Sequence, residues 1–376
     1  MKPRQLKFIS LAAMSVISAT FAPLARAALP PALPVNQMVI FGDSLSDTGN
    51  LVNLLANDPT YSSYIPAPPQ YAPGEFTDGA NTSPSTTKLG LWDQQFATDM
   101  GLPAPTPAYS TSFLTDYLFT NSYSLIAGGT NFAVGGAVTG GTVINLAAGA
   151  FQAGMSTELA AFESQFSTGT SISSGTLYAF WGGANDILNA ASATGATQST
   201  VISAGTTAAN NISGYISELA GRGGKYFLWF NLPPLATTPD GAASPLSAAI
   251  QSASNAFNTQ QTTDIATLEA ASPGIKIINV DVNALFASLA ANPGAYGFTN
   301  LTTPAQGLAV NPDQYLFWDG LHPTTAADSY LAAAAAKDTL NAFGIPTPEP
   351  ASLTIFITTA MLLAAGRARL MPRPRL

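Results

Sequence analysis

Short apolar runs alternate along this chain with longer segments in which apolar residues recur every three or four positions. Four of these runs end in turn residues; the first, for example, leads directly into Gly42-Asp43-Ser44. Short apolar runs bounded by turn signals predict buried β-strands. The predicted strands cover residues 36–41, 176–181, 225–230 and 274–280.

The segments between the runs predict helices. Apolar residues recur at helical spacing over residues 200–220 and 245–271, and the alanine-rich stretch 331–336 predicts part of another helix. Strands that alternate with helices predict a parallel sheet with helices on both faces, a three-layer α/β/α sandwich. Ligands bind such sheets beyond the carboxyl ends of the strands. Ser44 and Asn185 follow two of the predicted strands and are therefore expected near the site.

Residues 58–107 interrupt this rhythm. They are rich in Pro, Ser, Thr and Tyr and show no sustained period. Unstructured connections of this length are uncommon in compact domains unless they serve a function. We therefore expect an insertion that borders the site or acts as a mobile lid. The tyrosines between 61 and 71 are candidates for contact with an acyl chain or glycan, and an ordinary surface loop is the alternative.

The first 27 residues have the pattern of a secretory signal peptide. Three cations within the first seven residues precede an apolar run that ends near Ala19, and Ala25-Arg26-Ala27 supplies a small-x-small cleavage site. A short buried helix is the alternative interpretation. Export from the cytoplasm is expected, with a single domain over residues 28–347.

The last 29 residues have a different tripartite pattern. Pro348-Glu349-Pro350 precedes a mostly apolar stretch over 351–366, and four arginines follow it. Such a run with cations behind it is typical of a membrane stop, although it is shorter than the ~20 residues that span a bilayer. The pattern resembles the PEP-CTERM sorting signal of Gram-negative bacteria. This resemblance implies processing of residues 348–376 by an exosortase-type transpeptidase, and display at the cell surface, in the outer envelope or in the extracellular matrix. A simple membrane anchor is the alternative.

Composition restricts the possible partners. Hydrophobic residues make up 47% of the 376 positions, which is ample for a core, whereas charged residues make up only 9% against roughly 25% in average proteins. Residues 28–348 contain five basic and 20 acidic residues, a net charge of −15. Such a body repels nucleic acid. The chain has no cysteine, so its stability does not depend on disulfides.

The scarcity of reactive groups excludes several chemistries. With no cysteine and one histidine, the chain cannot build a zinc site from His and Cys ligands or a thiol nucleophile. Neither of the common glycine-rich nucleotide motifs occurs. The G-x-S-x-G motif of ordinary α/β-hydrolases is also absent. We expect no metal and no organic cofactor.

The one histidine is a candidate base for a serine nucleophile. A serine hydroxyl needs a base near neutral pH, and His322 is the only imidazole available. Asp319 precedes it by three positions, so in a helical turn the two side chains would meet. A lone histidine is more often structural, and Gly-Asp-Ser is a common turn, so neither feature is decisive alone. Ser44, however, follows a strand directly, which would project its side chain at the edge of the sheet.

Four motifs together are more specific than any one of them. In chain order they are F-G-D-S-L-S-D-T-G-N at 41–50, N-F-A-V-G-G at 131–136, G-A-N-D at 183–186 and D-G-L-H at 319–322. They resemble blocks I, II, III and V of the SGNH/GDSL hydrolases, a family of esterases and lipases. The resemblance spans nearly the whole body of the chain and implies a flavodoxin-like fold.

The resemblance also implies roles for individual residues. Ser44 would be the nucleophile, His322 the general base and acid, and Asp319 its orienting partner. The oxyanion hole would consist of the Ser44 and Gly136 backbone N–H groups and the Asn185 side-chain amide. Choosing Gly136 over Gly135 rests only on counting from Asn131.

Other polar and aromatic residues of the motifs are expected to be structural. Five polar side chains are expected to hold the turns around the site: Asp43, Asp47, Asn50, Asn131 and Asp186. The four tryptophans are expected in the core, and Trp181 and Trp318 are also candidates for the pocket wall.

The predicted function is an exported serine esterase or lipase that uses a Ser-His-Asp triad and an acyl-enzyme. The long first motif resembles the lipase, phospholipase and autotransporter-esterase branch of this family more than the short sugar-deacetylase branch, which implies lipid or short acyl esters as substrates. An exopolysaccharide O-acetyl esterase and a catalytically idle, surface-displayed binding protein are the alternatives. Substrate identity and oligomeric state are left open.

Overall fold

The computed structural model describes residues 33–56, 65–86, 90–112, 122–145 and 150–346. The predicted signal peptide and the predicted sorting segment with its apolar stretch lie outside these residues. Within the described part, every helix is too short or too polar to cross a bilayer.

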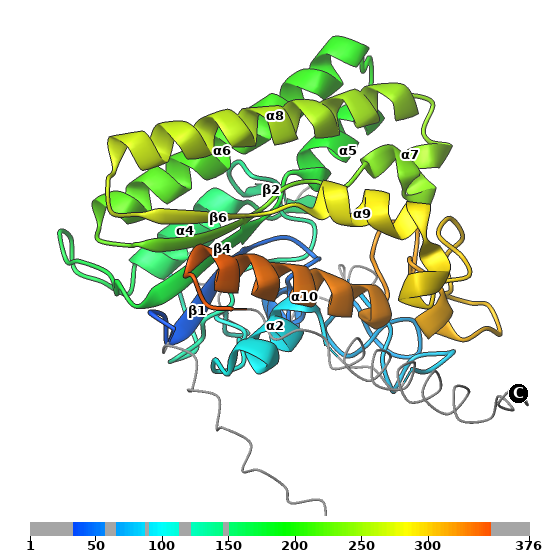
Figure 1. The fold of residues 1–376 in the computed structure, drawn as a ribbon, viewed down its shortest axis with the longest axis horizontal. Coiled ribbons are helices and arrows are strands. Elements are labelled where there is room, and N and C mark those ends of the chain that lie inside the picture. Colours follow the sequence, from blue (N-terminus) through cyan, green and yellow to red (C-terminus); the bar gives the residue numbers. More distant parts are fainter. Residues whose placement is uncertain (1–32, 57–64, 87–89, 113–121, 146–149, 347–376) are drawn as a thin grey trace, which may run out of the picture. The chain divides into compact units, whose positions relative to one another are not determined.

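Four parallel strands form the central sheet (Figure 1). Their order is β1 (Gln37–Gly42), β4 (Thr176–Trp181), β5 (Tyr226–Phe230) and β6 (Lys276–Val280). The segment 130–134 extends the sheet beyond β1, because the Phe132 N–H donates to the Ile40 carbonyl at 2.8 Å. With this edge segment the order along the sheet is the doubly wound one of flavodoxin-like folds. All four predicted strands are confirmed, and each ends within one residue of its predicted end.

Helices cover both faces of the sheet, which confirms the predicted three-layer sandwich. Side chains of β4 alternate between the faces: Tyr178 and Phe180 belong to one core, and Leu177, Ala179 and Trp181 to the other. The first core is covered by α1 (Asn50–Leu55), α4 (Met155–Glu163), α5 (Ala184–Ser192), α6 (Gln198–Gly221) and α8 (Ser247–Ala271). The second is covered by α2 (Trp92–Met100), α9 (Val282–Ala291) and α10 (Thr325–Ala342). Burial on both faces explains why the strands are apolar throughout instead of alternating.

The two long predicted helices are present as α6 and α8, which lie side by side on one face (Figure 1). The alanine-rich stretch lies within α10. A short hairpin of β2 (Val143–Asn145) and β3 (Ala150–Gln152) stands apart from the main sheet. The remaining elements are short: α7 (Pro239–Ala243), η3 (Leu235–Thr237), η4 (Pro293–Tyr296) and η5 (Pro312–Gln314).

The segment predicted as irregular contains a regular helix that we did not predict. Trp92, Phe96 and Met100 in α2 recur every four residues and are buried, but this stripe is too short to show as a sustained period. The preceding residues 65–86 lie against the segment that carries His322. Thr77 Oγ1 donates to the Pro323 carbonyl at 2.9 Å, and the Thr325 N–H donates to Asp78 at 2.7 Å.

Candidate active site

Two neighbouring strands place Ser44 and Asn185 at the same edge of the sheet. Gly42 at the end of β1 pairs with Trp181 at the end of β4, and the two polar residues follow shortly after. A Cβ on Gly42 would lie 2.3 Å from the Trp181 carbonyl oxygen. Only glycine therefore permits this close approach of the strand ends.

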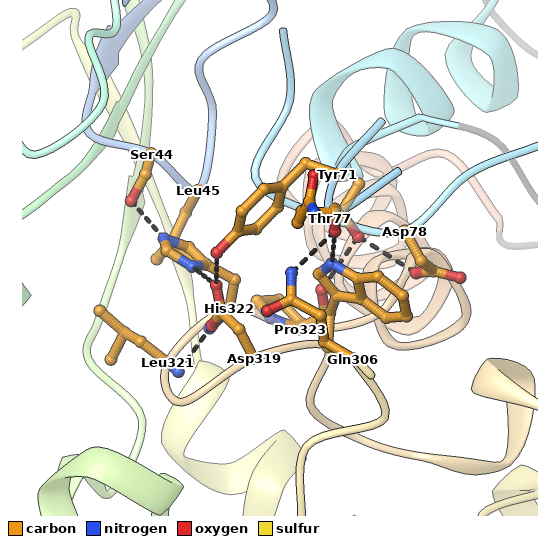
Figure 2. A network of polar contacts seen from close by, with 12 residues as sticks. Ser44, Leu45, Tyr71, Thr77, Asp78, Gln306, Asp319, Leu321, His322 and Pro323 are labelled. Carbon is orange, nitrogen blue, oxygen red and sulfur yellow. Dashed lines mark hydrogen bonds and ion pairs between the residues drawn. The ribbon is translucent and has the colours of Figure 1, made fainter. Parts of the chain in front are cut away.

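Ser44, His322 and Asp319 form a continuous hydrogen-bonded chain (Figure 2). Ser44 Oγ lies 2.7 Å from His322 Nε2, and His322 Nδ1 lies 2.7 Å from Asp319 Oδ2. Ser44 and His322 are 278 residues apart in sequence. The structure therefore brings together the three side chains that the motifs suggested as a triad.

Asp319 contacts His322 in a loop. The helical turn that the three-residue spacing suggested for this pair was therefore wrong. Asp319 Oδ1 accepts the backbone N–H groups of Leu321 and His322, at 2.8 and 2.7 Å. The Trp318 N–H donates to the His322 carbonyl at 2.8 Å and closes the loop. Asp side chains commonly stabilise turns by bonding to the backbone two residues ahead. The same carboxylate thus shapes the loop with one oxygen and receives the imidazole with the other.

The charges of Asp319 and His322 determine which nitrogen of the imidazole can accept a proton from Ser44. Burial alone would raise the pKa of Asp319, but the His322 ring and the hydrogen bonds donated to Asp319 outweigh it and hold the pKa well below its usual range. Burial opposes a charge on His322, yet the Asp319 carboxylate raises the pKa of His322 above its ordinary value. An ionised carboxylate only accepts hydrogen bonds, so Nδ1 of His322 carries the proton. Nε2 is then free to accept the proton of Ser44.

Two aromatic residues from the irregular segment complete the surroundings of the imidazole. The Tyr71 hydroxyl donates to Asp319 Oδ2 at 2.6 Å (Figure 2). The Phe76 ring stacks on the His322 ring, with centroids 4.9 Å apart and an angle of 28° between planes. The sequence singled out Tyr71 only as one of several tyrosines that could contact substrate. Nothing in the pattern around Phe76 indicated a role.

The backbone around Gly136 is suited to bind an oxyanion. Gly136 has a φ of +77°, a conformation that glycine adopts without a steric penalty. Its N–H makes no hydrogen bond within the described part of the chain, whereas the Gly135 N–H donates to Asp47 Oδ2 at 2.7 Å. The geometry therefore favours Gly136 over Gly135 as the donor.

The Asn185 side chain lies beside this backbone but is already hydrogen-bonded. Its Nδ2 donates to the Ala137 carbonyl at 3.0 Å and to Asp43 Oδ2 at 3.3 Å. The longer bond, to Asp43, is the weaker one. Burial raises the pKa of Asp43 to about 7. An amide can exchange this weak partner for a developing oxyanion without changing its own charge.

Helix α5 holds the oxyanion segment through further side chains. Asp186 accepts the backbone N–H and the hydroxyl of Thr139, at 2.9 and 2.8 Å. Asn189 donates to Gln152 Oε1 at 3.0 Å, and Gln152 Nε2 donates to the Gly136 carbonyl. The helix that carries Asn185 thus also fixes the Gly136 backbone.

The other polar residues expected to be structural are buried and hydrogen-bonded. Asp47 accepts the N–H groups of Gly49 and Asn50, and Asn50 donates to the Asn131 carbonyl at 2.8 Å. Asn131 donates to the Ser46 carbonyl at 2.6 Å. All four tryptophans have at most 2% of their surface exposed, and one of them, Trp181, also lines a pocket beside Ser44. Within the described residues, no three His, Asp or Glu side chains are grouped so as to hold a metal ion.

Several curated relatives resemble parts of the chain. A GDSL esterase/lipase of Arabidopsis thaliana is 31% identical over 98 residues, which is 22% of this chain and 27% of that protein. An uncharacterized Pseudomonas putida protein, from the trpE-trpG intergenic region, is 26% identical over 326 residues, 80% of this chain and 48% of that protein. The chain thus spans half or less of the length of these relatives.

Two solved structures resemble the fold distantly. Est24, a carbohydrate acetylesterase from Sinorhizobium meliloti, is 14% identical with a TM-score of 0.38, and the match covers 81% of this chain and 99% of that one. The aryl esterase of M. smegmatis is also 14% identical with a TM-score of 0.38, and the match covers 82% of this chain and 99% of that one. Likeness at this level says nothing about the substrate.

The family match covers most of the chain. It runs over residues 38–335, from the first residues of β1 into α10. This range includes Ser44, Asn185 and His322. The chain belongs to the family of GDSL-like lipases and acylhydrolases.

Proposed function

We propose that this protein is a serine hydrolase that cleaves carboxylic esters through an acyl-enzyme. The observation that carries the proposal is the chain of 2.7 Å contacts from Ser44 through His322 to Asp319. A serine hydroxyl becomes a nucleophile when an oriented base takes its proton. Membership in the family and the name of the Arabidopsis relative support an ester bond as the target.

In the first half-reaction Ser44 Oγ forms a bond to the ester carbonyl carbon, and its proton moves to His322 Nε2. The Asp319 carboxylate stabilises the imidazolium that results. The carbonyl π electrons move to the carbonyl oxygen, which becomes an oxyanion. The backbone N–H groups of Ser44 and Gly136 and the Asn185 amide are the donors for this charge.

Collapse of the tetrahedral intermediate breaks the bond to the leaving oxygen. His322 returns its proton to that oxygen, so an alcohol departs and the acyl group stays on Ser44. A water molecule then hydrolyses the acyl-enzyme. His322 accepts a proton from the water, and the water oxygen attacks the acyl carbon. His322 then returns the proton to Ser44 Oγ, so the carboxylic acid leaves and the Ser44 hydroxyl is restored. Both halves use the same base and the same donors.

Substitution of the nucleophile and the base tests this proposal. The full-length protein should hydrolyse p-nitrophenyl acetate and butyrate, and Ser44→Ala and His322→Ala should each lose at least about a thousandfold in kcat/KM while they keep their circular dichroism spectrum. Ser164→Ala is the matched control, because Ser164 lies at the end of α4 and its hydroxyl donates to the Ala161 carbonyl at 2.7 Å. Full activity in either site variant would remove the proposed mechanism. No hydrolysis of either ester by the unaltered protein would favour the idle binding protein.

We also propose that the protein is exported and sorted to the cell envelope. The cations, apolar run and small-x-small site of residues 1–27 support export, and the pattern of residues 348–376 supports processing by an exosortase-type transpeptidase. The test is fractionation of a Gram-negative host that has such an enzyme, with a variant lacking residues 348–376 for comparison. The full chain should reach the envelope or matrix in processed form. Uncleaved full chain in the cytoplasm would contradict the proposal.

A further inference from the structure

An apolar pocket opens directly beside Ser44. Asn185, Leu45 and Leu321 line its partly exposed side, and Figure 2 shows Leu45 and Leu321 beside the Ser44–His322 pair. The remaining walls are buried. Most of these buried walls consist of large apolar side chains: Trp181, Leu235, Phe286, Phe317 and Leu331.

The inner walls come from regular elements of the core. Trp181 ends β4, Phe286 lies in α9 and Leu331 in α10, and all three belong to one buried cluster with Phe317. Protein interiors are packed as densely as organic crystals, so such walls do not yield easily. The pocket therefore has a fixed depth, unlike a groove between surface loops.

The polar side chains of the wall already have partners. Thr238 Oγ1 donates to the Leu235 carbonyl at 2.8 Å and accepts the Gly241 N–H at 3.1 Å. Asp43 accepts the Leu45 N–H at 3.0 Å with one oxygen and the Asn185 amide with the other. A group that enters the pocket therefore meets mainly apolar surface. This suits an alkyl chain better than a sugar or a charged group.

The lining of the pocket favours the acyl side of the reacting bond over the leaving-group side. The leaving oxygen must come within reach of His322 Nε2 to receive its proton, and His322 does not line the pocket, whereas Ser44 and Asn185 do. A substrate whose carbonyl oxygen faces Asn185 would thus direct its leaving group toward His322 and its alkyl chain into the pocket.

The volume of the pocket limits the chain that it can hold. It measures about 30 Å³, and by this measure one water-sized group needs ~10–15 Å³. Two or three groups of about this size therefore fit, which corresponds to a chain of about two or three carbons. Because the carbonyl carbon stays at Ser44 Oγ, the acyl groups that fit run from acetyl to about butyryl.

We infer that this pocket receives the acyl chain and restricts the enzyme to short acyl esters, with Leu331 and Phe286 among the buried side chains that limit its size. The inference rests on the proposed function and adds the substrate class. An O-acetyl group on a glycan satisfies the same limit, whereas the acyl chains of ordinary lipids exceed it.

The test is a series of p-nitrophenyl esters with one leaving group and increasing acyl length, hydrolysed by the full-length protein. Each methylene from acetate to butyrate should raise kcat/KM about fourfold, as expected for ~0.8 kcal/mol per buried methylene. Octanoate should then fall at least tenfold below butyrate. If the octanoate or palmitate ester were hydrolysed as fast as the butyrate ester, the size limit would be overturned but the proposed function would stand. No turnover of any ester would overturn the proposed function as well.

A matched pair of substitutions tests which residues set the limit. Leu331→Ala enlarges the pocket and should raise the octanoate-to-butyrate ratio of kcat/KM at least tenfold. Leu289→Ala is the control, since Leu289 lies in the same core cluster and is equally buried at 1% exposure, but does not line the pocket. Its ratio should stay unchanged.

A narrowing variant keeps the inference testable if Leu331→Ala does not fold. Ala184 lines the pocket at the start of α5, and Ala184→Val adds two methyl groups to the wall. The butyrate-to-acetate ratio should fall at least tenfold in this variant. Because both readouts are ratios, a general loss of activity does not mimic them. Unchanged ratios in the folded variants would show that the chain binds elsewhere.

Discussion

Tyr71 donates its hydroxyl hydrogen to Asp319 Oδ2, the same oxygen that faces Nδ1 of His322. Asp319 thereby accepts four hydrogen bonds, two on each oxygen: Tyr71 and the imidazole on Oδ2, and the Leu321 and His322 backbone on Oδ1. Tyr71 lies 248 residues before Asp319 in the chain. The orientation of the His322 imidazole thus depends on a segment remote in sequence.

Removal of the Tyr71 hydroxyl should alter both the rate and its pH dependence. The hydrogen bond from Tyr71 helps to lower the pKa of Asp319, and its loss leaves a more localised charge beside His322. We expect Tyr71→Phe to lower kcat/KM about tenfold at pH 7, since hydrogen bonds to charged groups contribute ~1.5–3 kcal/mol. In a plot of kcat/KM against pH, the acidic limb should move to higher pH because the pKa of His322 rises.

Tyr330→Phe provides the control for this substitution, because the Tyr330 hydroxyl donates to the Tyr296 carbonyl at 2.7 Å away from the triad. Its rate and profile should match those of the unaltered protein. If Tyr71→Phe also left the acidic limb in place, Tyr71 would be a structural residue without influence on the imidazole.

The activity should rise with pH through a pKa above 6.5. His322 acts as a base only when Nε2 is unprotonated, and the Asp319 carboxylate raises the pKa of His322 despite its burial. kcat/KM measured from pH 5 to 9 should therefore be low at pH 5 and level off at alkaline pH. Asp319→Asn removes the neighbouring charge, so the limb should move to lower pH while the rate falls ~10²–10⁴-fold. A flat profile from pH 5 to 8 would rule out His322 as the base.

Two asparagines on one helix should differ in their effect. Asn185→Ala removes a proposed oxyanion donor, and such losses typically lower kcat ~10²–10³-fold. Asn189→Ala, one turn later in α5, removes only the bond to Gln152 that supports the Gly136 carbonyl, so we expect a decrease of only a few-fold. Steady-state kinetics with butyrate ester measures both. Equal losses would mean that Asn185 acts by holding the loop and not by binding charge.

The folded protein should be more stable at pH 5 than at pH 8. Burial raises the pKa of Asp43 to about 7 and that of Asp47 to about 6, and raises those of Asp93, Glu158 and Asp328 as well. A raised folded-state pKa contributes stability at low pH that is lost as pH rises through that pKa. His322 acts in the same direction, whereas the lowered pKa of Asp319 costs stability only below about pH 4. Thermal unfolding followed by circular dichroism should give the higher Tm at pH 5.

Asp328 is the sharpest single probe of this effect. Burial and the carboxyls of Asp78 and Asp93 raise the pKa of Asp328 well above its ordinary value, and the Trp92 backbone N–H offsets this only in part. Neither of its oxygens has a hydrogen-bond partner of normal geometry among the described residues. Asp328→Asn should raise Tm at pH 8 with little change at pH 5. Asp99→Asn, at an exposed position of α2, should alter neither, and a loss of stability at pH 8 in the Asp328 variant would contradict the account.

The sequence predicted the sheet because its strands are buried on both faces and end in turn residues. That pattern also placed Ser44 and Asn185 at one edge, where parallel strands end together. The close spacing of Asp319 and His322 made their pairing predictable. The helical turn was wrong because Asp319 bonds to its own loop backbone, a choice that spacing alone does not reveal.

The remaining features of the site depend on contacts between distant segments. Tyr71 and Phe76 lie in a stretch without periodicity, and their partners are about 250 positions further along. Counting from a motif could not decide between Gly135 and Gly136 as the oxyanion donor. The two differ because the Gly135 N–H donates to Asp47 and is therefore not available. The depth of the pocket depends on how α9 and α10 pack together, which no local pattern encodes.

Covalent labelling tests the central claim most directly. Diethyl p-nitrophenyl phosphate should form a bond between phosphorus and Ser44 Oγ in the full-length protein, with loss of p-nitrophenolate, and mass spectrometry should locate one diethylphosphoryl group on the peptide that contains Ser44. Ser44→Ala should take up no label, and His322→Ala should react far more slowly. Labelling at a different residue, undiminished in Ser44→Ala, would contradict the assignment of the nucleophile.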